Sequence, residues 1–150
     1  MSIPPTNLIG SLSGGAAFAV EIAAMLDDQR QARGKLGEDI ACEELRRRGY
    51  AILARRFRTR TGELDIIARD GGTLVFVEVK ARFSHRYGTA ADAITGRKRS
   101  KLVRMAEEFL LRSRLNRVPC RFDVVAVQQA GHGEPRVEVF PAAFGADETC

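Results

Sequence analysis

Three residues that could together act on phosphate esters lie in two neighbouring segments of the chain. Asp65 lies in residues 63–69, and Glu78 and Lys80 lie in residues 74–80; both segments are predicted strands. Side chains alternate along a strand, so Glu78 and Lys80 share a face, and the short turn between the segments brings Asp65 beside them. Two carboxylates can hold Mg²⁺, and a nearby ammonium can orient water or stabilise charge on a phosphate. The pattern predicts a metal site for phosphodiester hydrolysis.

The apolar surroundings of these charges strengthen that prediction. Val75, Val77 and Val79 alternate with the charged residues and point to the opposite face of the predicted strand. Charges next to a core are costly unless they are paired or bind metal. A buried ion pair between Glu78 and Lys80 is therefore the alternative interpretation.

The elements that position these residues follow from periodicity and turn signals. Apolar residues at helical spacing predict a helix over residues 31–48, ended by Gly49, and a second helix over residues 97–114. Asp70-Gly71-Gly72 is typical of a tight hairpin, so the strands on either side of it should be antiparallel. The predicted strands cover residues 50–57, 63–69, 74–80, 121–127 and 136–140. The order α-β-β-β-α-β-β predicts an α/β fold with a mixed sheet flanked by helices.

Close packing of the first helix is predicted from its small residues. Gly34, Gly37 and Ala41 lie on or near one side, where they would let the helix approach the sheet closely. Leu36 is expected on the apolar face of the same helix, and Glu38 borders the close-packed side.

The chain divides into an extension and a domain. Residues 1–30 are predicted to be a flexible or partly helical N-terminal extension, with a helix over residues 16–26, and residues 31–150 to form a single domain. No Lys or Arg precedes the apolar residues 14–20 and Glu21 interrupts them, so we expect neither a signal peptide nor a membrane span. Met25 is a candidate for the natural start of the chain.

Composition favours a polyanionic partner. The 150 residues are 45% hydrophobic with a formal charge of +5, supplied mostly by arginine, whose planar fork suits phosphate. The basic residues gather in two clusters: Arg46, Arg47, Arg48, Arg55, Arg56, Arg58 and Arg60, and then Arg97, Lys98, Arg99, Lys101 and Arg104. Each cluster predicts either contact with nucleic acid or simply a solvated face.

Cysteines and histidines do not form a recognisable site. Cys42, Cys120 and Cys150 are odd in number and widely spaced, which favours neither a disulfide framework nor a zinc ribbon and fits a reducing cytoplasm. Cys42 is expected to be a small core residue. His85 and His132 fall in predicted loops without partners at ligand spacing, so we do not expect zinc.

The carboxylate and lysine pattern resembles the PD-(D/E)XK nuclease superfamily, in which an acid on one strand is followed on the next by Glu-x-Lys. Wider motifs over residues 32–140 resemble the YraN family of endonuclease-like proteins, which is itself similar to archaeal Holliday junction resolvases. These motifs are Gly37-Glu38, Gly49-Tyr50, Gly62-Glu63-Leu64-Asp65, Asp70-Gly71, Val75-Phe76-Val77-Glu78-Val79-Lys80-Ala81-Arg82, Lys98 and Arg121-Phe122-Asp123-Val124-Val125. Leu64 stands where the superfamily's name has proline.

The resemblance implies a restriction-endonuclease-like fold with Glu38, Asp65, Glu78 and Lys80 as active-site positions. Glu38, Asp65 and Glu78 would hold Mg²⁺ or Mn²⁺, with Glu38 the helix-borne acid. The implied activity is an endonuclease acting on DNA, including branched or damaged DNA, and similarity to resolvases implies a homodimer.

Other residues have two interpretations each. Nucleic-acid contact or plain solvation is open for Arg58, Arg60, Arg82 and Lys98. Glu63 would either support the site or pair with a surface arginine, and Asp123 would either support the site or form a structural salt bridge. The main alternative to an endonuclease is a module with the nuclease fold that binds nucleic acid or a protein without cutting.

Overall fold

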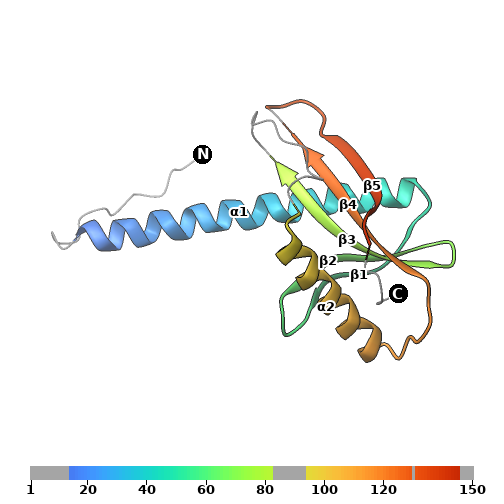
Figure 1. Ribbon diagram of the computed structural model, residues 1–150. Coiled ribbons are helices and arrows are strands. Elements are labelled where there is room, and N and C mark those ends of the chain that lie inside the picture. The colour runs from blue at the N-terminus through green and yellow to red at the C-terminus, as the bar shows by residue number, and fades with distance from the viewer. Residues whose placement is uncertain (1–13, 83–93, 130, 146–150) are drawn as a thin grey trace. The chain divides into compact units, whose positions relative to one another are not determined.

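The structure is a computed structural model that describes residues 14–82, 94–129 and 131–145. Figure 1 shows its elements, which are α1 (Gly14–Arg47), β1 (Ala51–Arg58), β2 (Glu63–Asp70), β3 (Thr73–Arg82), α2 (Gly96–Arg112), β4 (Cys120–Gln128) and β5 (Arg136–Phe144). The predicted order α-β-β-β-α-β-β and the mixed α/β fold are confirmed.

The described strands form one five-stranded sheet in the order β1-β2-β3-β4-β5. β3 and β4 are parallel and are connected through α2, whereas the other neighbouring pairs are antiparallel. The predicted hairpin between β2 and β3 is confirmed, and Gly71 adopts the positive φ of +57° that such a turn requires.

One face of the sheet packs against α2. Leu102, Met105 and Ala106 are the buried residues of α2, as their helical spacing predicts, and they lie against a core that includes Leu74 and Phe76 of β3. Aromatic rings continue this core across the sheet, with centroid distances of 5.1 Å for Phe57 and Phe109, 5.5 Å for Phe76 and Phe122, and 4.8 Å for Phe122 and Phe144. α2 is thereby packed against the sheet that contains β3, the strand that carries Glu78.

The other face packs against the second half of α1. Ala41, Cys42 and Leu45 are fully buried there, next to Val75 and Val77 of β3. This confirms the predicted alternation of β3, since Leu74 and Phe76 belong to the core on the α2 side. Glu78 and Lys80 continue the α2-facing series of the strand.

Close approach of α1 to β3 depends on one glycine. A Cβ on Gly37 would lie 2.5 Å from the Cβ of Ala81, whereas a Cβ on Gly34 would meet nothing within 4 Å. The prediction was therefore right for Gly37 and wrong for Gly34. Leu36 was also misplaced, because its side chain is 45% exposed. Gly49 ends the helix with φ +93°, as predicted.

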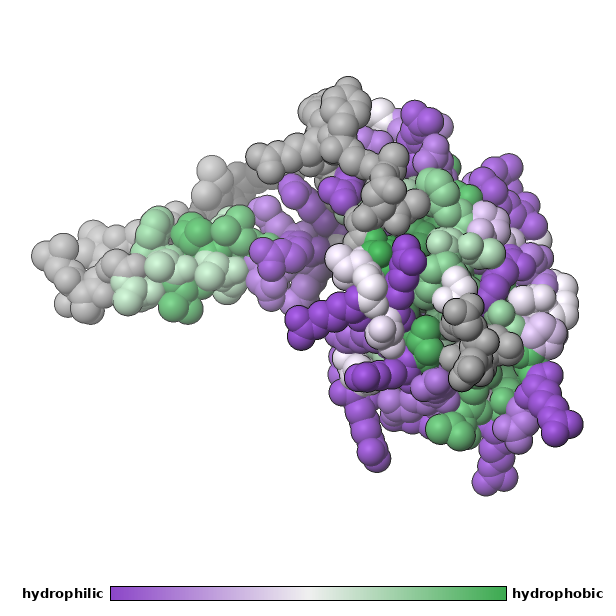
Figure 2. Space-filling view, viewed as in Figure 1, coloured by the Kyte–Doolittle hydropathy of each residue, from purple (hydrophilic) through white to green (hydrophobic). Residues whose placement is uncertain are grey.

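The chain falls into two compact units, one ending at Ala32 and the other beginning at Arg33. Residues 14–32 form the first part of α1, so the expected start of the first helix near residue 31 was wrong. Apolar side chains are exposed along this segment, and Figure 2 shows them as a green region: Phe18, Val20, Ile22, Met25 and Leu26. None of the helices within the described ranges has the length and apolar character needed to cross a membrane.

The cysteine prediction is partly wrong. Cys42 is a buried free thiol, as expected for a small core residue. Cys120 is disulfide-bonded, which the wide cysteine spacing did not predict. His85 lies outside the described residues, and His132 is exposed.

Candidate active site

The candidate site lies where the pairing of β2 and β3 ends. The ladder runs from Asp70 opposite Thr73 to Ile66 opposite Val77. One residue beyond its end, the carboxylate of Asp65 accepts a hydrogen bond of 2.8 Å from the backbone N–H of Val79. Where the two strands separate, the side chain of Asp65 thus serves as the hydrogen-bond acceptor for the backbone of β3. This bond holds Asp65 beside the Glu78 to Lys80 segment.

Glu78 is the buried centre of the site, with 9% of its surface exposed. Its Oε1 lies 3.7 Å from Nζ of Lys80, two residues along β3. The same oxygen lies 2.6 Å from Nζ of Lys98, which comes from the first turn of α2. The structure therefore brings Asp65, Glu78 and Lys80 together and adds Lys98, for which the sequence left nucleic-acid contact and plain solvation open.

The electrostatics of the site are unusual for carboxylates. Burial and the neighbouring charge of Glu78 together raise the pKa of Asp65 to about 7, against the lowering effect of the Val79 hydrogen bond. Asp65 and Glu78 therefore sit close enough to resist being ionised together. An added positive charge between them would relieve that cost.

The two lysines shift in opposite directions. Burial lowers the pKa of Lys80, and the adjacent ammonium of Lys98 lowers it further. Burial is the largest effect on Lys98 and opposes its charge, but the hydrogen bonds to Glu78 and Lys80 and the charges of Glu78 and Asp65 together outweigh it and raise the pKa of Lys98. Lys80 is thus the more readily deprotonated of the two, and Lys98 the more permanent cation.

Glu38 borders this group but is held by arginines. Its Oε2 accepts a hydrogen bond of 2.7 Å from Nε of Arg56 and lies 3.9 Å from the guanidinium of Arg55. Its charge still contributes to the raised pKa of Asp65. In the described part of the chain, no group of three or more His, Cys, Asp or Glu side chains is arranged to hold a metal ion.

The donor set nevertheless fits a hard divalent cation. Mg²⁺ is usually bound by only one or two carboxylates, with water and substrate phosphates completing its shell. Asp65 and Glu78 supply two oxygen-donor groups; within the described residues Asp65 forms no ion pair, whereas Glu78 already pairs with Lys80 and Lys98. The assignment of Glu38 as a third ligand stays a prediction, and its Oε2 already accepts the Arg56 hydrogen bond.

Glu63 and Asp123, which each had two interpretations, both have partners in the structure. Glu63 lies 3.5 Å from Nε of Arg58, whose side chain is largely in solvent while that of Glu63 is partly exposed, as expected for a surface pair. Asp123 is 1% exposed and binds Arg121, Tyr50 and the backbone N–H of Ala142. These contacts favour the structural interpretation for both acids.

The remaining predicted phosphate contacts lie on the surface. Arg58, Arg60 and Arg82 are exposed, and Arg60 contacts α2 through its backbone N–H, which donates to Glu108. Their role in binding nucleic acid stays a prediction.

Sequence reasoning missed the arginines that hold Glu38. Arg55 and Arg56 were grouped with a phosphate-binding cluster, but Arg55 donates to Asp39 at 2.6 Å and Arg56 to Glu38. The adjacent acids Glu38-Asp39 facing the adjacent bases Arg55-Arg56 were the available signal.

Fold and site together define an α/β protein with a carboxylate and lysine site at a strand fork. The chain belongs to the Uncharacterised protein family UPF0102, whose model matches residues 37–127 and so includes Glu38, Asp65, Glu78 and Lys80. This is the YraN family to which the motifs pointed.

Relatives in this family are similar over most of their length. The chain is 48% identical over 113 residues to the UPF0102 protein of Symbiobacterium thermophilum, covering 75% of this chain and 96% of the relative. It is 46% identical over 119 residues to that of Syntrophotalea carbinolica, covering 79% and 96%. The UPF0102 protein of Pseudomonas aeruginosa strain LESB58 is 43% identical over 116 residues, covering 76% and 93%.

Proposed function

We propose that this protein is a Mg²⁺- or Mn²⁺-dependent endonuclease that hydrolyses phosphodiester bonds in DNA. The observation that carries the proposal is the convergence of Asp65 and Glu78 at the strand fork, with Nζ of Lys80 3.7 Å from Glu78. An acid with a raised pKa, here Asp65, beside a second acid and a lysine is the arrangement expected in a hydrolytic centre.

Each side chain has a separate role in this proposal. Asp65 and Glu78 would hold the cation, which when bound lowers the pKa of water and offsets charge on the phosphate. Lys80, whose pKa is lowered, orients the attacking water and accepts its proton. Lys98 stays charged and stabilises the negative charge that develops on the phosphate oxygens.

A cleavage assay tests the proposal. End-labelled duplex, flapped and four-way DNA, with an RNA duplex for comparison, are incubated with Mg²⁺, Mn²⁺ or EDTA. We expect metal-dependent cleavage that falls by about 100-fold or more in Glu78→Gln and in Lys80→Ala. Glu63→Gln is the matched control, because Glu63 is an acid of β2 that pairs with surface Arg58. Cleavage that survives both site substitutions would contradict the proposal.

A second candidate is a module with the nuclease fold that binds nucleic acid without cutting it. It is favoured by the cations already on the acids, since Lys98 lies 2.6 Å from Glu78 and Arg56 lies 2.7 Å from Glu38. This candidate predicts binding that weakens with salt and does not depend on metal. Absence of cleavage on every substrate, together with such binding, would select it.

The partner and location belong to the same proposal. We propose that the protein is located in the cytoplasm, because its proposed substrate, DNA, is expected there. A homodimer would place two sites on the symmetric strands of a four-way junction. Sedimentation with and without junction DNA tests that assembly.

A further inference from the structure

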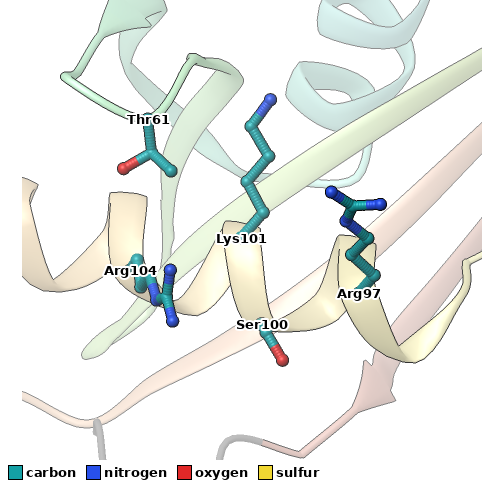
Figure 3. Close-up of a pocket in the computed structure, with 5 residues that line it drawn as sticks. All are labelled: Thr61, Arg97, Ser100, Lys101 and Arg104. Carbon is teal, nitrogen blue, oxygen red and sulfur yellow. The ribbon is translucent and has the colours of Figure 1, made fainter.

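α2 carries a basic pocket beside the candidate site. The pocket is an open cavity of about 680 Å³. Figure 3 shows the five residues that line it: Thr61, Arg97, Ser100, Lys101 and Arg104. Positions 97, 101 and 104 follow the helical interval, so the three cations lie on one side of α2. Thr61 comes from the turn between β1 and β2. We call this group the α2 pocket.

Among the residues that the structure describes, the cations of the α2 pocket have no acidic partner. Arg97, Lys101 and Arg104 are exposed, and within the described ranges none of them forms an ion pair with a carboxylate. Many other arginines are matched to a carboxylate of the same chain: Arg30, Arg47, Arg48, Arg55, Arg56, Arg58, Arg112, Arg121 and Arg136. Three uncompensated cations around one cavity form a site of strongly positive potential, which favours an anionic ligand.

The pocket is held in shape by contacts between the turn and α2. A Cβ on Gly62 would lie 2.9 Å from Cε and 3.0 Å from Nζ of Lys101, so the lysine lies closely over the turn. The backbone N–H of Arg60 donates to Glu108 at 3.1 Å, and Arg112 donates to the carbonyl of Arg58 at 3.1 Å. Both walls of the pocket are therefore anchored to each other before any ligand binds.

The same helix connects the pocket to the candidate site. Lys98, which lies 2.6 Å from Glu78, is in the first turn of α2, one residue from Arg97. Six residues of helix separate Lys98 from Arg104, a rise of about 9 Å, which matches two to three nucleotides of a duplex strand at about 3.4 Å each. A strand with one phosphate at Glu78 could therefore place its next phosphates along α2.

We propose that the α2 pocket binds the phosphodiester backbone of the nucleic acid, two to three nucleotides from the phosphate at Asp65 and Glu78. This rests on the proposed function for the position of the strand. Arginine forks at Arg97 and Arg104 pair with phosphate oxygens in two-point contacts, and Lys101 adds a point charge. The contacts are to the backbone and carry no base preference.

Binding measured without metal tests the pocket. A fluorescein-labelled DNA duplex is titrated in EDTA at several salt concentrations against the triple variant Arg97→Gln/Lys101→Gln/Arg104→Gln. We expect Kd to rise by about 10-fold or more and the slope of log Kd against log salt to fall by about 2 to 3.

The matched control also removes three positive charges. Arg47→Gln/Arg48→Gln/Arg136→Gln changes arginines that already pair with Glu44 and Glu138. It should keep Kd within about 3-fold of the wild type, since only non-specific attraction is lost. Circular dichroism melts of both variants establish that they fold. Equal losses in the two triple variants, or none in the α2 variant, would overturn the proposal.

Cleavage by the α2 variant, measured beside its binding, separates this inference from the proposed function. If no substrate is ever cleaved but binding still depends on the α2 pocket, the endonuclease proposal fails and the pocket stands. If cleavage occurs and its KM is unchanged in the α2 variant, the pocket fails and the endonuclease stands.

Discussion

Two carboxylates on the same sheet, the fully buried Asp123 and the partly buried Asp65, have very different surroundings. Asp123 on β4 accepts hydrogen bonds from Nε of Arg121 at 2.9 Å, from the Tyr50 hydroxyl at 3.1 Å and from the backbone of Ala142 at 2.9 Å. Asp65 on β2 accepts from the backbone of Val79 and faces a second acid, Glu78.

The two environments differ in how they compensate negative charge. The guanidinium of Arg121, which binds Asp123, also reaches Asp70. Asp123 and Asp70 raise the pKa of Arg121, so positive and negative charges are matched here. Around Asp65 the pKa of the carboxyl rises to about 7, because burial and Glu78 outweigh its hydrogen bond. A compensated acid stabilises the fold, whereas an under-compensated one is prepared to receive a cation.

The largest expected difference is in stability. Asp123→Ala removes a fully buried acid and leaves the donors of Arg121, Tyr50 and Ala142 without their acceptor, so we expect the free energy of unfolding to fall by about 3–5 kcal/mol. Asp65→Ala should cost far less, because it also removes repulsion with Glu78. Urea denaturation of both variants measures the difference. Equal losses would mean that Asp65 is as structural as Asp123.

Two glycines of α1 provide a smaller, matched test. Gly37→Ala would place a Cβ 2.5 Å from that of Ala81, next to Lys80 of the site, and should cost about 1–3 kcal/mol. Gly34→Ala meets nothing within 4 Å and should stabilise the helix by about 0.5–1 kcal/mol. Thermal melts of the two variants measure both changes. The same sign for both would contradict the close approach of α1 to β3.

The raised pKa of Asp65 should make the stability of the fold depend on pH. The pKa of Asp65 rises from 3.8 to about 7 on folding, so the folded state binds the extra proton. This group's contribution to stability is therefore complete below about pH 4 and is lost as pH rises through about 7. In EDTA, the wild type should lose more stability between pH 5 and pH 8 than Asp65→Asn. Parallel curves in urea denaturation would refute the raised pKa.

Much of the fold was predictable because local patterns encode it. The Asp70-Gly71-Gly72 turn, the helix end at Gly49 and the apolar stripe of α2 each depend on residues close in sequence. The alternation of side chains along β3 likewise predicted which of its residues face each side of the sheet. Periodicity reports burial well, since burial repeats with the geometry of the element.

The pairing of long charged side chains was not predictable in the same way. Lys98 reaches Glu78 and Arg56 reaches Glu38 only because α2, β1 and α1 meet in the folded chain. The functional group of a lysine or arginine lies several bonds from its backbone, so its partner depends on tertiary positions that a sequence pattern does not contain. For the same reason Asp123 could not be assigned until its contacts with Tyr50 and Arg121 were known.

Mn²⁺ titration calorimetry of the purified protein tests the central contrast most directly. The under-compensated Asp65 should bind Mn²⁺ together with Glu78, and Asp65→Asn and Glu78→Gln should each abolish that binding. Glu63→Gln, which alters an acid on the same strand paired with Arg58, should bind as the wild type does. Absence of heat in the wild type, or unchanged Mn²⁺ binding in Asp65→Asn, would contradict the assignment of this strand fork as a metal site.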